Sequence, residues 1–199
     1  TGISRIEVRK TVSQPDNIHV GMAIVADFGD APNTYRTNYN SRGNEPAIHI
    51  LRNVGSPSVY LGTGVDADGN GIANAAANSD NDEGIASFPI LRTNDDTYTV
   101  DLTCTSGGKI GAWIDFNQNG SFDNNEYAYS ECSAGNATIT WNGISGLIVG
   151  QTYARFRIGS TVSEIANPFG IAWDGEVEDY TITIQEPSTP DLEIVKSVD

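Results

Sequence analysis

Apolar and polar residues alternate one by one along several stretches of this chain. The alternation is regular in residues 98–103, 137–141, 153–158 and 180–184, where Thr, Tyr, Val and Ile recur. Because successive side chains of a β-strand point to opposite faces, a period of two predicts strands that are buried on one face. β-Branched and aromatic residues also favour strands. The pattern therefore predicts a series of half-buried strands.

Glycine, Asn and Asp gather between these stretches, and the chain contains 21 glycines. Such residues supply turns. The one helix candidate is a short Ala-rich piece from Ile72 to Asn78. Short strands that are separated by turns, with no helices between them, are typical of a β-sandwich. We therefore expect an all-β fold of the sandwich type.

Residues 27–84 break the pattern, because alternation is weak there and Asp, Asn, Gly and Pro are frequent. Long loops of this kind are uncommon in compact domains unless they are functional or held in place. Across the chain, 26 acidic residues stand against 11 basic ones, a net charge of −15. This charge argues against nucleic acid and anionic membranes as partners. The acids either keep the chain soluble or bind cations, and their spacing favours a calcium-binding sandwich with metal-held loops.

The sequence offers little support for zinc, a membrane span or catalysis. Its two cysteines, Cys104 and Cys132, lie far apart, and its two histidines are His19 and His49. The cysteines form a disulfide in an oxidising compartment or remain buried thiols. No apolar run reaches the roughly 18 residues that a spanning helix needs. Common hydrolase motifs are also missing from the sequence, so we do not expect an enzyme.

The clearest chemical signal is the loop of residues 115–126, here called the calcium loop. Its oxygen-bearing residues fall at positions 1, 3, 5, 9 and 12, with Gly120 at position 6, as in an EF-hand loop. They are Asp115, Asn117, Asn119, Asp123 and Glu126. Strand-like residues 110–114 and 127–130 flank the loop, so we expect it to connect a hairpin around a structural calcium ion. The alternative is a turn rich in Asn and Gly that binds no metal.

A second acidic region lies in residues 66–83. It begins with ligand types at positions 1, 3 and 5 of a similar loop, but it lacks an acid at position 12, so later acids would have to close the site. The candidate ligands are Asp66, Asp68, Asn70, Asp80, Asp82 and Glu83. The alternative is a solvated acidic loop.

Two smaller acidic groups lie near the ends of the folded region. Asp27 and Asp30 flank a glycine turn, and Glu176, Glu178 and Asp179 begin a strand. In an alternating strand Glu176 and Glu178 share one face, where like charges are destabilising without a cation. We therefore add all five residues to the candidate metal ligands.

The chain divides at its Pro-rich segment. We expect residues 1–186 to form a single β-sandwich ligand-binding domain, and residues 187–199 to be a linker followed by the first strand of another repeat. Residues 6–13 and 192–199 share Glu, Lys and Val at equal spacing, which is a weak repeat or a coincidence. The first residue is not Met and no signal peptide precedes the domain, so we expect a monomeric module cut from a longer secreted protein.

Taken together, these motifs resemble a family of bacterial surface domains, the GEVED domain. Residues 27–32, Tyr35, His49, residues 61–68 and residues 82–84 resemble its first half, and residues 113–117, 154–157 and 175–180 resemble its second half. The resemblance covers roughly residues 25–185. The module is also similar to the calcium-dependent peptide-binding domain of RTX adhesins, and the tail from Asp191 resembles the start of a DUF11-type repeat.

The resemblance implies a β-sandwich with several calcium ions, one of which is exposed and captures the C-terminal carboxylate of a peptide or protein on another cell. It implies an adhesion module at the extracellular bacterial cell surface. The ligand would be contacted at Asp27, Asp66, Asp82, Glu178 and Trp173, rather than at the calcium loop. The alternative is a calcium-stiffened structural spacer in a surface stalk, with no ligand of its own.

Overall fold

The computed structural model describes residues 25–38, 45–51, 59–65, 67, 71–78 and 84–188. Strands dominate these residues, and the fold is all-β, as predicted. The repeat of residues 6–13 and 192–199 and the tail from Asp191 lie outside the described residues. None of the described helices is long and apolar enough to cross a membrane.

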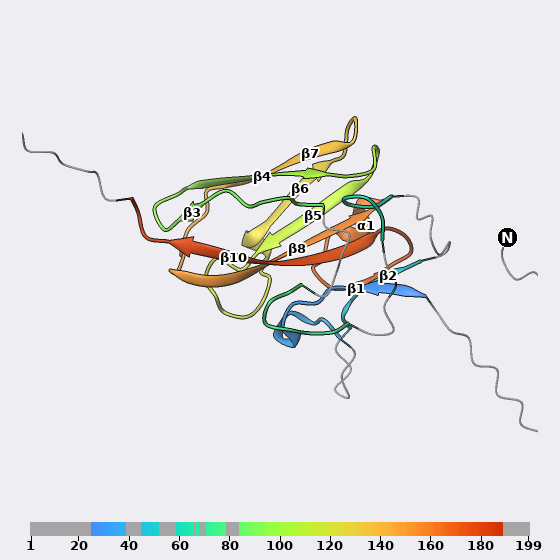
Figure 1. Cartoon of the computed structure of the whole chain (residues 1–199), viewed down its shortest axis with the longest axis horizontal. Helices are drawn as coiled ribbons and strands as arrows, with labels where there is room; N and C mark the ends of the chain where they lie inside the picture. The colour runs from blue at the N-terminus through green and yellow to red at the C-terminus, as the bar shows by residue number, and fades with distance from the viewer. Residues whose placement is uncertain are drawn as a thin grey trace, which may run out of the picture.

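A five-stranded sheet forms the centre of the structure. Its order is β3 (Leu91–Arg92), β10 (Glu176–Gln185), β8 (Gly150–Gly159), β5 (Lys109–Ile114) and β6 (Tyr127–Glu131). β8 and β10 are the long central pair and run antiparallel (Figure 1). Along β8, Ala154, Phe156 and Ile158 are buried in the apolar core. Arg155 and Arg157 alternate with them, so they lie on the opposite face of the sheet.

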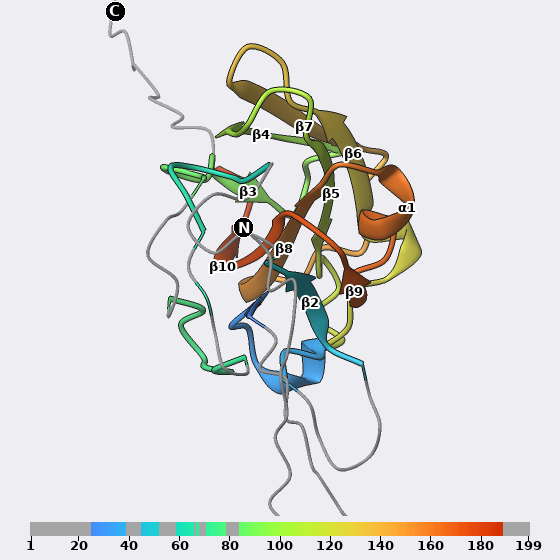
Figure 2. The ribbon, with the colours of Figure 1, turned by 90° about the vertical axis from the view of Figure 1, so that its right-hand side faces the viewer.

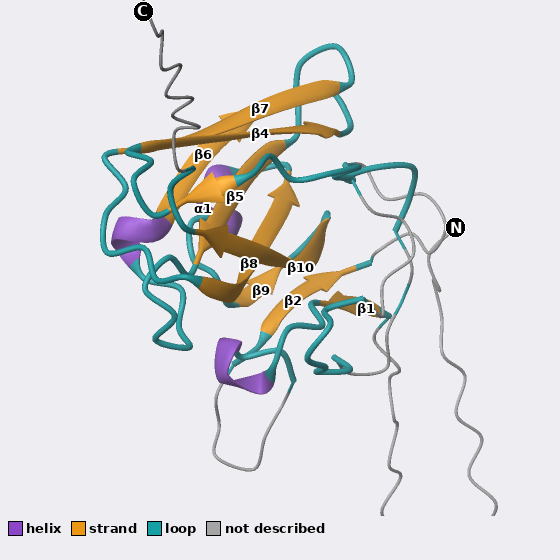
Figure 3. Ribbon diagram, turned by 60° about the vertical axis from the view of Figure 1, so that its left-hand side comes forward, coloured by secondary structure: helices purple, strands orange, loops and turns teal. Residues whose placement is uncertain are grey.

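The two faces of this sheet are covered differently. A ribbon of β4 (Thr97–Thr103) and β7 (Asn136–Asn142) covers the apolar face (Figure 3). The alternation predicted for these two strands is confirmed, since both alternate strictly between exposed or partly exposed and buried residues. A smaller sheet of β1 (Ala26–Phe28), β2 (Ala47–Ile50) and β9 (Gly170–Ala172) lies on the other side. The fold is therefore sandwich-like, with a third layer over the arginine face.

The described residues also contain three short helical turns. η1 (Asn33–Tyr35) precedes β2, η2 (Asn124–Glu126) ends the calcium loop, and α1 (Val162–Ile165) packs beside β5, β8 and β9 (Figure 2). Cys104 and Cys132 form a disulfide that joins the end of β4 to the end of β6. Of the two alternatives that the sequence left open, a disulfide or buried free thiols, the structure therefore has the disulfide.

The Ala-rich helix candidate is wrong. Residues 71–78 run without helix, and Ala77 has a positive φ of 44°. Other groups use the backbone that a helix would need: the Asn74 side chain accepts the amide of Ala76, and the side chains of Gln151 and Tyr153 donate to the carbonyl of Ala75. These local and long-range hydrogen bonds compete successfully with a helix of only two turns.

Candidate functional site

The calcium loop connects β5 and β6, which pair antiparallel from Lys109 with Glu131 to Trp113 with Tyr127. The predicted hairpin is therefore confirmed. Asp115 follows β5 directly and Glu126 precedes β6, and both are almost fully buried, at 0% and 1% exposure. Gly120 has a φ of +82°, a left-handed conformation that glycine adopts without strain, and so it permits the sharp turn of the loop.

The acids of the loop hold its backbone. The Asp115 carboxylate accepts the amides of Asn119 and Gly120, at 3.1 and 2.9 Å. The Glu126 carboxylate accepts the amides of Phe116 and Asp123, at 3.0 and 2.8 Å. Both acids therefore point into the loop, as a loop that encloses a cation requires.

The loop concentrates negative charge. The pKa of Glu126 is raised to about 7: burial is the largest cause and the nearby carboxylates of Asp115 and Asp123 contribute, while the amides that Glu126 accepts act in the opposite direction. In the described part of the chain, none of these three carboxylates forms an ion pair with Lys or Arg. A divalent cation with oxygen ligands fits such a group.

The metal itself stays a prediction. Within the described ranges, no group of three or more His, Cys, Asp or Glu side chains is placed to hold a metal ion. A calcium ion in the loop would therefore need the amide oxygens of Asn117 and Asn119 beside the carboxylates, as the spacing predicts. At present the Asn119 side chain donates to Asp123 at 2.8 Å, and the Asn117 side chain donates to Glu126 at 3.2 Å.

The raised pKa of Glu126 predicts how stability changes with pH when calcium is chelated. An acid whose pKa is higher in the folded than in the unfolded chain stabilises the fold at low pH, and loses that contribution as pH rises through the folded value. The contribution should therefore fall between about pH 4.5 and about pH 7. Urea unfolding in chelator across this range should show this loss in the wild type and a reduced loss in Glu126→Gln. Identical pH profiles would contradict the assignment.

A buried ion pair lies on the arginine face of the central sheet. Arg155 binds Asp179 through Nε and Nη2, each at 2.7 Å from a carboxylate oxygen. Its remaining donors reach the carbonyls of Tyr35 and Pro168, at 2.7 and 2.9 Å. Asp179 also accepts the amide of Ala31 at 2.9 Å. This pair therefore ties the segment around η1 to the sheet, and it engages both oxygens of a predicted metal ligand.

The other predicted ligands of β10 and β1 bind backbone amides. Glu178 accepts the amide of Gly84 at 3.1 Å, Glu176 accepts the amide of Leu61, and Asp27 accepts the amide of Val177 at 2.6 Å. Because side chains alternate along a strand, Glu176 and Glu178 share one face of β10, whereas Asp179 points to the other. Asp30 accepts the Asn74 side chain at 3.4 Å.

The remaining predicted ligands cannot be placed. Asp66, Asp68, Asn70, Asp80, Asp82 and Glu83 lie outside the described residues. Their chain neighbours are informative, because Leu61 and Gly84 flank this region and donate to Glu176 and Glu178. Leu61 and Gly84 themselves therefore lie beside two buried acids of β10.

Arg157 and His49 form a polar contact that sequence reasoning did not assign. Arg157 Nε donates to His49 Nε2 at 3.0 Å, so the ring donates from Nδ1 to the carbonyl of Asp174 at 2.7 Å. Burial, and then the charge of Arg157, lowers the pKa of His49 well below its usual value. Arg157 also donates to the carbonyls of Asn167, Phe169 and Gly170. The sequence did contain one signal for this contact: Arg155 and Arg157 alternate with apolar residues along one strand, which indicates a polar face opposite the apolar core.

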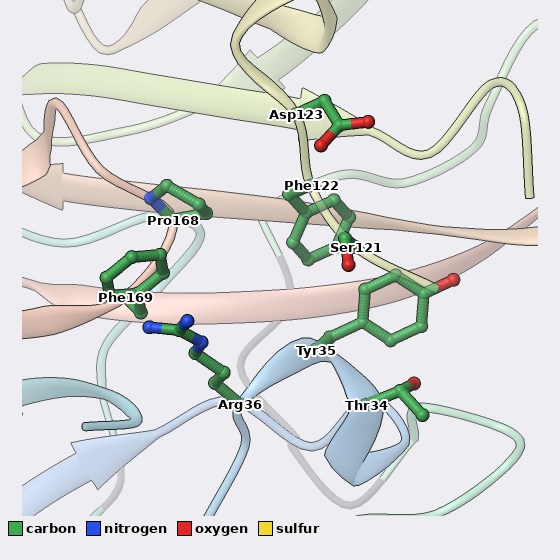
Figure 4. A pocket seen from close by; sticks show the side chains of 8 residues that line it. All are labelled: Thr34, Tyr35, Arg36, Ser121, Phe122, Asp123, Pro168 and Phe169. Atoms are coloured by element: carbon green, nitrogen blue, oxygen red, sulfur yellow. The ribbon is translucent and has the colours of Figure 1, made fainter. Parts of the chain in front are cut away.

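A pocket of about 240 Å³ opens beside the calcium loop (Figure 4). Its walls come from three segments: the η1 segment, the second half of the calcium loop and the segment before β9. The lining residues are Thr34, Tyr35, Arg36, Ser121, Phe122, Asp123, Pro168 and Phe169. The predicted ligand contact Trp173 is not among them and is 53% exposed. The structure therefore provides a recess at the loop where the sequence predicted none.

Comparison with known proteins supports one part of the resemblance. The family model of the GEVED domain matches residues 109–183, which run from β5 into β10 and include the calcium loop and both buried arginines. No curated protein and no solved structure matches the chain. The likeness to RTX adhesins and to a DUF11-type repeat stays a prediction. The chain thus carries a GEVED-type domain, which points to a surface-associated protein.

Proposed function

We propose that this chain is a calcium-dependent adhesion module of a bacterial surface protein, which binds a peptide or protein ligand outside the cell. One observation carries the proposal: one wall of the pocket, formed by Ser121, Phe122 and Asp123, belongs to the calcium loop itself. The proposed role is binding rather than catalysis, and the proposed partners do not include nucleic acid.

The hydrogen bonds of the calcium loop connect the proposed ion to the shape of the ligand pocket. Glu126 accepts the amide of Asp123, and Asp115 accepts that of Gly120, so the acids fix the chain on both sides of Phe122. Tyr35, on the facing wall, donates its hydroxyl to Asp115 at 2.6 Å. Without a cation the three loop carboxylates repel one another, since like charges at close range oppose ionisation. Calcium would remove this repulsion and set the shape of both walls.

The site that the resemblance implied is a separate proposal. An exposed ion held by Asp27, Asp66, Asp82 and Glu178 would have to draw on residues outside the described part, because Asp27 and Glu178 are each 1% exposed. Several calcium ions remain part of the proposal: one braces the calcium loop and the others bind beside Glu176 and Glu178.

The test is a screen of immobilised peptides, with free or amidated C-termini, against the full chain in calcium and in chelator. We expect binding that chelator weakens at least about tenfold, which is about 1.4 kcal/mol. Asp115→Asn should bind weakly in both conditions, whereas the exposed Asp96→Asn should behave as wild type. Ligand binding that is unchanged by chelator would contradict the calcium dependence. Stabilisation by calcium without any ligand would favour the structural spacer.

A further inference from the structure

The first and last described strands lead to opposite ends of the long axis (Figure 1). β1 begins at the right of this view and β10 ends at the left, and both strands run from right to left. The chain continues beyond them, through residues 1–24 and 189–199. A pull on these two flanking segments would therefore draw β1 and β10 in opposite directions along their own lengths.

β1 and the beginning of β10 are in contact, and two buried carboxylates join them. The Asp27 carboxylate on β1 accepts the amide of Val177 on β10, at 2.6 Å. In the opposite sense, the Asp179 carboxylate on β10 accepts the amide of Ala31, which follows β1, at 2.9 Å. Each segment therefore holds the backbone of the other. Residues 27–31 and 177–179 are here called the clasp.

Arg155 reinforces the clasp from the central sheet. Its guanidinium binds both oxygens of Asp179 and also donates to the carbonyl of Tyr35, so the chain that follows Ala31 is bound to the sheet as well. Hydrogen bonds with a charged partner are stronger than neutral ones, and a buried site strengthens them further. The clasp therefore consists of strong contacts that water does not reach.

The rest of β10 is held by its neighbours. It pairs antiparallel with β8 from Glu176 to Ile184, and its last residues pair in parallel with β3. Just past the strand, the Arg92 side chain donates to the carbonyl of Glu186 at 2.8 Å. Tension that crosses the clasp can therefore leave along one continuous, supported strand.

The direction of a pull decides how such contacts fail. When two segments are drawn past each other along their lengths, all the bonds between them are loaded together. When two strands are separated from one end, their bonds break one after another. A pull on the flanking segments loads the clasp in the first way. Because forced unfolding is governed by the unfolding rate, the need to break several buried bonds at once should make it slow.

We infer that the clasp carries tension between the segments that flank residues 25–188, and that it passes this tension directly from β1 to β10. All residues that line the pocket, and the whole calcium loop, lie between Ala31 and Val177 in the chain. They are therefore outside the path of the tension and keep their shape while the clasp holds. The inference goes beyond the proposed function, because it applies equally to an adhesion module and to a structural spacer.

Single-molecule force spectroscopy of the full chain in calcium can compare two directions of pull at one constant force. Handles at residues 1 and 199 load the clasp along its strands. Handles at Val149 and residue 199 separate β8 from β10 at one end, because Gly150 pairs with Ile184 and Val149 is exposed. We expect the wild type to unfold at least about tenfold more slowly in the first direction, where several bonds to charged groups must break together.

Variants of Asp27 test whether the clasp is the reason. Asp27→Ala should raise the unfolding rate at least about tenfold with the terminal handles, and much less with the handles at Val149 and residue 199. Asp27→Asn keeps an oxygen that can accept the Val177 amide, so it should restore part of the resistance. Asp174→Ala is the matched control: the Asp174 carboxylate also accepts a backbone amide, that of Ser160 at 3.1 Å, but outside the path. It should leave the ratio of the two rates as in the wild type.

Equal unfolding rates of the wild type in the two directions would overturn the inference, and this comparison needs no variant to fold. Faster unfolding of Asp27→Ala by the same factor in both directions would overturn it too, because Asp27 would then only stabilise the fold. A ratio that changes as much in Asp174→Ala as in Asp27→Ala would show that the path does not run through the clasp. Peptide binding without force, which the screen above measures, is independent of these results.

Discussion

Asp179→Asn should destabilise the fold by about 3–5 kcal/mol, the range found when one partner of a buried ion pair is removed. The reason is the position of Arg155, which is fully buried and binds both oxygens of Asp179. Asparagine has nearly the same shape, but it leaves the guanidinium as an uncompensated buried charge. The free energy of unfolding in urea, measured in calcium, would give the difference.

The exposed pair between Lys109 and Glu131 provides the matched control. Its N–O distance of 2.8 Å is close to that of the buried pair, yet the Glu131 side chain is 57% exposed. Surface pairs contribute little because water already solvates both charges. Glu131→Gln should therefore leave the free energy of unfolding nearly unchanged. Equal effects of the two substitutions would show that burial does not set the contribution of Asp179.

The same ion pair has a consequence for the pocket. Arg155 donates to the carbonyls of Tyr35 and Pro168, which belong to two different walls. Gly29 lies against this pair so closely that an added Cβ would be 2.3 Å from Asp179 Oδ2. The segment around η1 is therefore positioned by packing on the central sheet, and the walls of the pocket depend on a contact outside it.

Local pattern was enough to predict the long strands. β4, β7, β8 and β10 alternate because one face of each packs in the apolar core, and such alternation is visible in the sequence. The shorter strands were missed for a physical reason. β1 pairs with β2, and β2 pairs in parallel with β9, more than 100 residues later. Strands of three or four residues owe their conformation to such long-range pairing rather than to their own sequence.

The candidate site also has parts that local sequence pattern predicts and parts that depend on long-range contacts. The calcium loop is continuous, so its spacing predicted the turn, the flanking hairpin and the inward acids. The pocket is assembled from residues 34–36, 121–123 and 168–169, and no local pattern connects these segments. The pairing of Arg155 with Asp179 required the register that sets these two residues opposite each other on β8 and β10.

Calcium should raise the thermal midpoint of the full chain strongly. A ligand that binds only the folded state at about 1,000 times its dissociation constant adds about 4 kcal/mol to the free energy of unfolding. For a domain of this size, that corresponds to a rise of roughly 8–16 °C. Glu126→Gln should lose most of the rise, because Glu126 supplies the last position of the calcium loop and lies beside Asp115 and Asp123. Differential scanning calorimetry in calcium and in chelator would measure it.

Two comparisons make this result specific to the loop. Asp96→Asn removes one exposed acid far from the loop in sequence. If calcium binds in the loop, rather than acting through net charge alone, this variant should show the same rise in thermal midpoint as the wild type. Magnesium at the same concentration should raise the midpoint less, because it prefers a tighter octahedral shell and gives up water reluctantly. A full response in Glu126→Gln would place the ion elsewhere, beside Glu176 and Glu178. A midpoint that is the same in calcium and in chelator would contradict calcium binding altogether, and the buried acids of the loop would then have to be balanced by protonation, as the raised pKa of Glu126 allows.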